Sequence, residues 1–239
     1  MRLDKFLATV GLGSRKEVKG LIKKGQIKVN EKEIKSDKFQ VNEWTDIVSY
    51  EGERVFYQKD FYYILNKPAG VISATQDNYE QTVLDLFDES SYREDLFPVG
   101  RLDKDTEGLL VLTNDGVLAH QLLSPKKHVE KEYFAKIRGV MTEEDVTAFS
   151  RGLVIDGGEE TRPAQLFIDA VDLVTNTSNI RLILHEGKFH QVKRMVKAVG
   201  KEVTYLKRIR MGNFYLPEEL AIGEYRPMTE EEVHQLEGK

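Results

Sequence analysis

The chain has 239 residues, with 35 lysines and arginines against 40 aspartates and glutamates and a formal net charge of −5. Its 40% hydrophobic content is typical of a globular protein and too high for a disordered chain. The absence of cysteine excludes a disulfide scaffold, a thiolate metal site and cysteine catalysis. The charges of Arg2, Asp4 and Lys5 leave no apolar signal-peptide core at the start of the sequence. No apolar run approaches the roughly 20 residues that a membrane span needs. We therefore expect a cytoplasmic protein with no membrane partner.

The charge is unevenly distributed along the chain. Residues 1–40 hold 11 basic and 5 acidic residues, whereas residues 41–239 hold 24 and 35. Such asymmetry suggests a basic module that meets nucleic acid, joined to a second domain. Residues 185–210 form a second basic stretch inside the acidic part. Because phosphate binding depends on local potential, the overall acidic charge does not exclude it.

Two short helices are predicted at the N-terminus. The apolar spacing over residues 3–10 indicates one buried helical face, which ends at the glycines of residues 11–13. Ser14 followed by Glu17 is typical of a capping box, so a second helix is predicted from there to about Lys24. The face of this helix opposite its apolar residues carries four cations: Arg15, Lys16, Lys19 and Lys23. From composition alone, this basic face is either a solvated surface or an RNA-binding one.

The rest of the chain mixes strands and helices without a regular strand–helix–strand repeat. This pattern predicts an α+β fold with a largely antiparallel sheet. Residues 54–60 are interpreted as a linker. Strands are predicted near 26–30, 46–50, 61–65, 109–113, 132–137, 181–185 and 204–211, and helices near 82–87, 117–123, 142–151 and 189–199.

The densest group of chemically functional residues lies at 100–116, where Asp103, Asp105 and Glu107 occupy alternate positions. A calcium loop of the EF-hand type is excluded, because its twelfth position needs a bidentate Glu and is Asn114 here. A carboxylate pair for glycoside hydrolysis remains open, since one acid can protonate the leaving group while the other attacks or stabilises. An acidic turn without catalytic function is also open.

The same stretch carries a family resemblance. Gly-Arg-Leu-Asp at 100–103, Asp-Thr at 105–106 and Gly-Leu-Leu at 108–110 resemble the signature of the RsuA-type pseudouridine synthases. Three further segments resemble other parts of that family: residues 62–70, 124–133 and 186–195. The resemblance covers nearly the whole chain. It implies a small S4 (αL-like) RNA-binding domain at 1–58 and a catalytic domain at 59–239, with a mixed, mainly antiparallel central sheet flanked by helices.

The resemblance also implies a reaction. These enzymes cleave the C1′–N1 bond of a uridine within ribosomal RNA, turn the base and rejoin it through C5, without metal or organic cofactor. Asp103 matches the family's essential carboxylate, and Tyr133 matches its active-site tyrosine. Breaking the glycosidic bond develops positive charge at C1′, which a carboxylate can stabilise or trap covalently. Attack of the carboxylate on the base, or removal of a proton alone, are the alternatives that stay open for this family. Without the motif, Tyr133 is interpreted as a core tyrosine whose hydroxyl finds a partner.

Lys193 and Arg194 compete for the role of basic partner to Asp103. The predicted helix has an apolar stripe formed by four residues: Val192, Met195, Val196 and Val199. Lys193 lies at the edge of this stripe, about 100° from Val192, whereas Arg194 lies about 200° away and is expected to face outward. The family alignment agrees, so we predict that Lys193 keeps the Asp103 carboxylate charged and oriented. Arg194 and Lys197 are assigned to the RNA backbone.

The remaining candidates are RNA contacts. Arg101 matches the family arginine that is associated with displacing the target base from its stack. Arg208 and Arg210 are expected to share one face of a strand and to extend the RNA-binding track. His128 and His190 show no spacing typical of metal ligands and receive no assignment, and no metal site is expected.

The substrate is predicted from two segments. Residues 190–195 and 223–231 resemble small-subunit rRNA enzymes more than large-subunit relatives, whereas the pair Thr106-Glu107 is associated with the latter. We therefore expect a monomer that modifies 16S rRNA, free or in an assembly intermediate, with a 23S rRNA uridine as the alternative. A non-catalytic S4 assembly factor would need the basic patches but not Asp103, Tyr133 and Lys193 together. A glycoside-processing enzyme would not need the basic helices.

Overall fold

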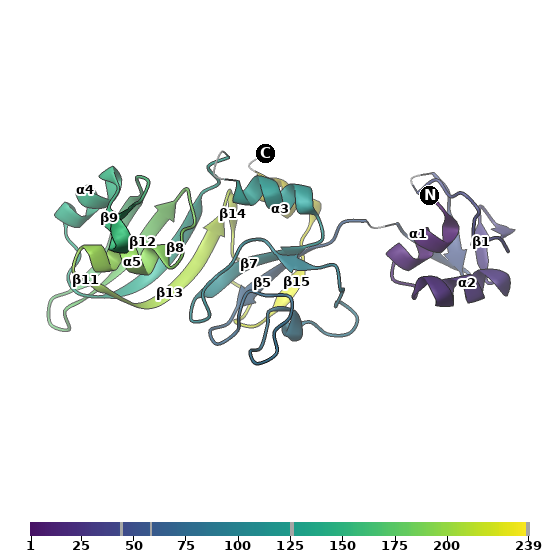
Figure 1. Cartoon of the computed structure of the whole chain (residues 1–239), viewed down its shortest axis with the longest axis horizontal. Coiled ribbons are helices and arrows are strands. Elements are labelled where there is room, and N and C mark those ends of the chain that lie inside the picture. Colours follow the sequence, from purple (N-terminus) through teal and green to yellow (C-terminus); the bar gives the residue numbers. More distant parts are fainter. Residues whose placement is uncertain (44, 58, 125–126, 238–239) are drawn as a thin grey trace. The chain divides into compact units, whose positions relative to one another are not determined.

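The computed structural model describes residues 1–43, 45–57, 59–124 and 127–237. The chain divides into two compact units, Met1–Asp60 and Phe61–Lys239 (Figure 1). Each unit has its own hydrophobic core. Among the described residues, no helix has the length and apolar character that crossing a membrane requires.

The first unit packs two helices against a small antiparallel sheet. Its elements are α1 (Leu3–Thr9), α2 (Arg15–Lys23), β1 (Ile27–Val29), β2 (Lys32–Glu33), β3 (Val48–Tyr50) and β4 (Glu53–Val55), with the strands in the order β2-β1-β3-β4. The capping box that starts α2 is confirmed, since the Ser14 amide donates to the Glu17 carboxylate at 2.7 Å and the Glu17 amide donates to the Ser14 hydroxyl at 3.4 Å. The predicted start of the linker is wrong, because Arg54 pairs with Ser49 in the β3–β4 ladder.

In the described part of the second unit, nine strands form one sheet. The main path is β11-β12-β8-β13-β7-β5-β15, while β14 pairs with β13 and β6 with β7. The strands are β5 (Tyr62–Lys67), β6 (Phe97–Pro98), β7 (Glu107–Thr113), β8 (Lys131–Arg138), β11 (Gln165–Asp172), β12 (Thr177–Leu184), β13 (Glu202–Met211), β14 (Phe214–Tyr215) and β15 (Tyr225–Pro227).

Short elements flank this sheet. They are η1 (Leu84–Leu86), α3 (Gly116–Leu123), α4 (Glu143–Arg151), the ribbon β9 (Val154–Ile155) and β10 (Glu159–Glu160) with η2 (Asp156–Gly158) between its strands, α5 (Gln191–Ala198) and α6 (Glu230–Glu237). The predicted helix at 82–87 is only the single turn η1. Apolar clusters cover both faces of the central strands, so β7 is a continuous apolar run rather than an alternating one.

One parallel ladder among the described strands joins the two halves of the sheet. It pairs β13 with β7 through Lys207–Glu107 and Arg208–Gly108, whereas the other neighbouring strands are antiparallel. Gly108 has a φ of +102°, and a Cβ there would lie 2.2 Å from the Arg208 carbonyl oxygen. Glycine is therefore required for this close approach. The predicted α+β fold with a mixed, mainly antiparallel sheet is confirmed.

Candidate active site

A cleft of about 830 Å³ opens beside the junction of β7, β8 and β13. Its walls come from the loop before β7, the first half of β8 and the segment that leads into α5. The polar or charged side chains that line it include Arg101, Asp103, Lys131, Tyr133, His190 and Arg208.

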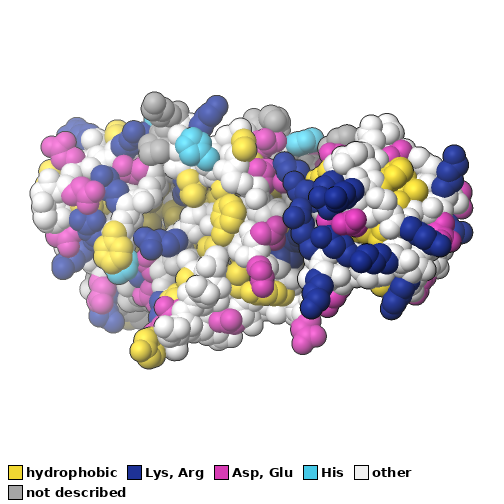
Figure 2. Space-filling model, turned by 45° about the vertical axis from the view of Figure 1, so that its right-hand side comes forward, with side chains coloured by type: hydrophobic (Ala, Val, Ile, Leu, Met, Phe, Trp, Pro, Cys, Tyr) yellow, Lys and Arg dark blue, Asp and Glu magenta, His cyan; other side chains and the backbone are white. Residues whose placement is uncertain are grey.

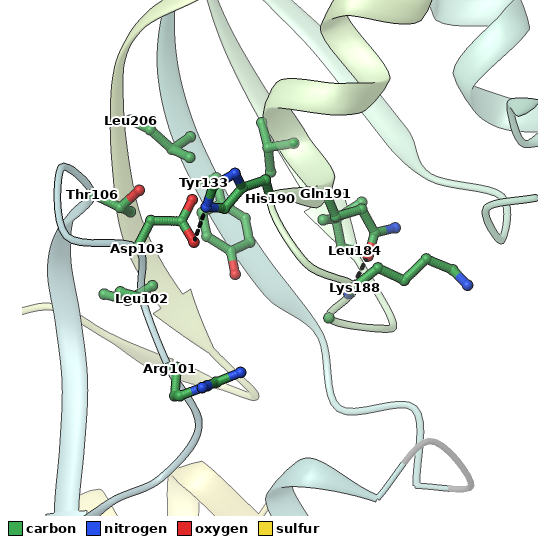
Figure 3. A pocket seen from close by; sticks show the side chains of 12 residues that line it. Arg101, Leu102, Asp103, Thr106, Tyr133, Leu184, Lys188, His190, Gln191 and Leu206 are labelled. Carbon is green, nitrogen blue, oxygen red and sulfur yellow. Dashed lines mark hydrogen bonds and ion pairs between the residues drawn. The ribbon is translucent and has the colours of Figure 1, made fainter. Parts of the chain in front are cut away.

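Asp103 lies in the loop between β6 and β7, with 26% of its side chain exposed. Its Oδ2 accepts a hydrogen bond from Lys193 Nζ at 3.0 Å, and Lys193 also donates to Asp105 Oδ1 at 2.6 Å. His190 Nε2 lies 3.6 Å from the second oxygen of Asp103. Figure 3 shows the Asp103 carboxylate directed toward the His190 ring, with the Tyr133 ring beside it. The structure thus brings Asp103 and Lys193 together across 90 residues of chain.

The charges of this cluster support one another. Burial alone would lower the pKa of Lys193, but its bonds to Asp105 and Asp103 raise that pKa overall. Burial would likewise raise the pKa of Asp105, yet the Lys193 bond and charge leave it lowered. Lys193 is therefore a protonated, half-buried cation held between two acidic side chains at neutral pH.

Lys67, at the end of β5, holds the Asp103 loop in place. Its side chain is fully buried, and its ammonium group donates to the carbonyl oxygens of Pro68 (2.9 Å), Asp103 (3.2 Å), Lys104 (3.3 Å) and Thr106 (2.9 Å). Burial lowers the pKa of Lys67 to about 8, although three nearby acids partly oppose this effect. The sequence prediction gave Lys67 no role. The signal that could have found it is a lysine close behind a buried apolar run and directly before Pro68.

A second polar contact fixes the other end of the loop. The Leu102 amide donates to the Ser73 hydroxyl at 3.0 Å, and that hydroxyl donates back to the Leu102 carbonyl at 3.0 Å. With Lys67, this contact holds the backbone on both sides of Asp103. The carboxylate is therefore preorganised rather than free to swing with a mobile loop.

Tyr133 lies on β8 with 9% of the residue exposed, and it lines the cleft together with Asp103. Ala135 and Ile137 follow it on the same buried face of β8. Its register partner on β13 is Arg208, so these two side chains share the cleft face of the sheet.

His190 and Phe189 form an aromatic pair at the mouth of the cleft. His190 has a left-handed backbone, with a φ of 49°, directly before α5, and its ring stacks on Phe189 with the centroids 3.7 Å apart. Phe189 is 71% exposed. The sequence prediction left His190 unassigned, although its position three residues before Lys193 could have indicated a shared site. His128 lies elsewhere, with Nδ1 2.9 Å from Arg162.

The predicted outward orientation of Arg194 is wrong. Its guanidinium pairs with Asp156 and with Glu159, the latter at 2.9 Å, and only 17% of the side chain is exposed. The helical phase placed Arg194 away from the apolar stripe correctly, but the β9–β10 ribbon covers that face. Its charge is therefore neutralised by protein carboxylates. Lys197, one turn later, is exposed.

The prediction that Arg208 and Arg210 share one face is also wrong. A bulge in β13 pairs Arg208 with Tyr133 but Arg210 with Glu132, the next residue of β8, which places the two arginines on opposite faces. Arg210 pairs with Glu132 at 2.8 Å and Glu130 at 2.9 Å. Arg208 instead faces the cleft and is only 2% exposed. Neither arginine forms an exposed track.

The cations of α2 form a basic face on the first unit. Arg15, Lys16 and Lys23 are exposed, whereas Lys19 is 43% exposed and lies 3.8 Å from Asp4 and 3.7 Å from Asp37. Figure 2 shows lysine and arginine side chains gathered on this unit. In the second unit, Arg101 is exposed at the edge of the cleft. Within the described ranges, no group of three or more His, Asp or Glu residues could hold a metal ion.

Comparison with known proteins identifies the family. The sequence model of RNA pseudouridylate synthases matches residues 61–198, and that of the S4 domain matches residues 1–45. The chain belongs to the RNA pseudouridylate synthase family. Its second unit thus carries the synthase fold, and the expectation from the sequence motifs is confirmed.

Relatives match over nearly the full length. The chain is 50% identical to the RNA pseudouridine synthase YtzG of Bacillus subtilis, over 99% of this chain and 98% of that protein. It is 41% identical to the ribosomal small subunit pseudouridine synthase A of Vibrio cholerae (98% and 98% covered) and 39% identical to the ribosomal large subunit pseudouridine synthase B of B. subtilis (98% and 95%). A crystal structure of a pseudouridylate synthase matches with a TM-score of 0.67 and 35% identity, over 99% of both chains.

Proposed function

We propose that this synthase converts one uridine of 16S rRNA to pseudouridine, with Asp103, Tyr133 and Lys193 as its catalytic residues. The observation that carries the proposal is the 3.0 Å ion pair between Lys193 and Asp103, whose carboxylate lines a cleft together with Tyr133. In this proposal the S4 domain (1–58) docks the RNA and the second domain (59–239) performs the chemistry.

Asp103 acts where the glycosidic bond breaks. When the C1′–N1 bond of the target uridine breaks, its electron pair leaves with the uracil and positive charge develops at C1′. The Asp103 carboxylate, fixed by Lys193 and by the loop contacts of Lys67, stabilises or traps that centre. The turned base then bonds to C1′ through C5, loses the C5 proton and gains a proton at N1, so the product is an isomer of the substrate.

Tyr133 and Arg101 act on the base. The target uridine must leave its stack to enter the cleft, which costs a few kcal/mol unless it is unpaired. Arg101 is exposed at the cleft edge, where its side chain can fill the space that the base vacates. The Tyr133 ring offers an apolar face for the uracil, while its hydroxyl lies at the place of the proton transfers.

The choice of 16S rRNA depends on local sequence. Identities of 41% and 39% to a small-subunit and a large-subunit enzyme do not separate the two substrates. Residues 190–195 and 223–231 favour the small subunit. We further propose that the enzyme acts in the cytoplasm as a monomer, because one chain supplies all the residues assigned to the site; light scattering should give a mass near 27.5 kDa.

The test is base-resolution mapping of pseudouridine. Purified protein is incubated with unmodified 16S and 23S rRNA transcripts and with small-subunit assembly intermediates. The proposal predicts one new pseudouridine in 16S rRNA. Modification confined to 23S rRNA would contradict the substrate and retain the reaction. No pseudouridine in any of these RNAs would contradict the proposed function itself.

A further inference from the structure

Two buried cations line the active-site cleft but take no part in the proposed reaction at Asp103. Lys131, the first residue of β8, is 8% exposed, and Arg208, in β13, is 2% exposed. Arg208 is the register partner of Tyr133, and Lys131 precedes Tyr133 by two residues on the same strand. All three side chains therefore lie on the cleft face of the sheet.

These cations lack the carboxylates that neutralise their neighbours. Arg208 Nε donates to the Leu109 carbonyl at 2.8 Å, and Lys131 Nζ donates to the Val129 carbonyl at 3.2 Å. Within the described part of the chain, Arg208 Nη2 is buried without a hydrogen-bond partner, and neither cation has an ion pair. Arg210, two residues away on the same strand, has two carboxylate partners.

Two unpaired like charges below a cleft are unfavourable for the empty protein. Burial and then the charge of Arg208 lower the pKa of Lys131 to about 8. Buried charges in proteins are normally paired, so an uncompensated pair facing a cavity indicates a missing anion. The fold holds both cations in place before that anion arrives.

We propose that Lys131 and Arg208 form a subsite for one phosphodiester group of the RNA strand beside the target uridine. This inference rests on the proposed function. A smaller cavity of about 70 Å³, lined by Asp103, Tyr133 and His190, is the place for the uracil, and neither cation lines it. The cations lie in the wider cleft, where the strand must pass, and guanidinium and ammonium groups are the usual protein partners of phosphate.

The subsite differs from the basic face of α2. Exposed lysines and arginines bind phosphates of any strand at the surface, whereas a buried pair can contact only a strand that has entered the cleft. Lys131 and Arg208 are thus expected to place the sugar–phosphate backbone so that C1′ of the target lies at Asp103.

The first test compares Lys131→Met with Lys136→Met, which removes an exposed lysine of the same strand. We expect Lys131→Met to unfold at a temperature no lower than the wild type, to bind its rRNA fragment about tenfold more weakly, and to lower the salt-dependence slope of binding by about 1. Lys136→Met should match the wild type, and Lys131→Arg should restore most of the affinity. A destabilised Lys131→Met with unchanged affinity would overturn the subsite.

The second test locates the phosphate. Single neutral methylphosphonate linkages are placed in turn around the target uridine, and binding is measured without following turnover. One such linkage should lower the affinity of the wild type for the RNA about tenfold but the affinity of Lys131→Met less than twofold. The variant has already lost the charged hydrogen bond to that phosphate, so neutralising the phosphate costs it little more. A scan without such coupling would overturn the subsite even if pseudouridine forms. Coupling in a protein that forms no pseudouridine would overturn the proposed function and retain the subsite.

Discussion

Replacing Lys67 with methionine is expected to destabilise the second unit and to misplace Asp103. The buried ammonium group contacts four carbonyl oxygens, three of them in the loop from Asp103 to Thr106. The ammonium group has three N–H donors, which the four oxygens share. At about 1.5 kcal/mol for each hydrogen bond from a charged donor, the three contribute about 4.5 kcal/mol. Methionine would leave these oxygens without their donor.

Part of that loss is offset by removing a buried charge. Burial lowers the pKa of Lys67 from 10.5 to about 8, a difference that corresponds to about 3 kcal/mol. The net destabilisation of Lys67→Met is therefore expected to be about 1.5 kcal/mol, which is a measurable part of the stability of a typical domain.

Urea unfolding and single-turnover kinetics of the full chain test this value. We expect a lower urea midpoint and a pseudouridine formation rate reduced at least tenfold, with RNA affinity within twofold of the wild type, because the loop is displaced while the basic face of α2 is intact. Lys136→Met serves as the control. A Lys67→Met protein with the wild-type midpoint and rate would refute the reasoning.

Three further outcomes are expected. Gly108→Ala should lower the free energy of unfolding by at least about 2 kcal/mol in urea titrations, because its methyl group would meet the Arg208 carbonyl oxygen; an unchanged midpoint would contradict this. The folded pKa of Lys131, about 8, lies below its ordinary 10.5, so between these pH values the unfolded chain binds more protons and stability rises with pH. The free energy of unfolding of Lys131→Met should accordingly exceed that of the wild type by about 3 kcal/mol at pH 7, and this difference should close near pH 10.5. A difference that stays constant in urea titrations across this pH range would contradict a buried, unpaired Lys131. Finally, replacing an exposed cation of α2 with alanine should lower the salt-dependence slope of RNA binding by about 1. The change should be smaller at Lys19, which lies beside Asp4 and Asp37. Slopes equal to that of the wild type in all these variants would argue against this RNA-binding face. The exposed positions are Arg15, Lys16 and Lys23.

Local features of the fold were predictable from sequence because they depend on neighbouring residues. The capping box of Ser14 and Glu17 starts α2, as expected, and the helix predicted near 142–151 begins with a second capping box, formed by Thr142 and Asp145. Strand β11 was missed, because most of its residues are exposed and its apolar alternation is weak. The helix predicted at 82–87 is only the single turn η1, because no residue in the sequence marks where that helix would end.

In the site, too, the sequence predicted what depends on neighbouring residues and missed what depends on tertiary contacts. The helical phase placed Lys193 at the edge of the apolar stripe, and the structure places its ammonium group on Asp103. The same phase could not show that residues 156 and 159 fold over Arg194. The bulge that separates Arg208 from Arg210 inserts a single residue, which strand alternation alone does not reveal.

The most direct test of the catalytic proposal compares Asp103→Asn with Asp105→Asn. Both acids contact Lys193, but Asp105 is 73% exposed, whereas Asp103 points into the cleft. Asparagine keeps the shape of the side chain and removes its charge. Asp103→Asn should fold, bind rRNA with wild-type affinity and form no pseudouridine in base-resolution mapping, while Asp105→Asn should retain measurable turnover. Wild-type pseudouridine formation by Asp103→Asn would contradict the account.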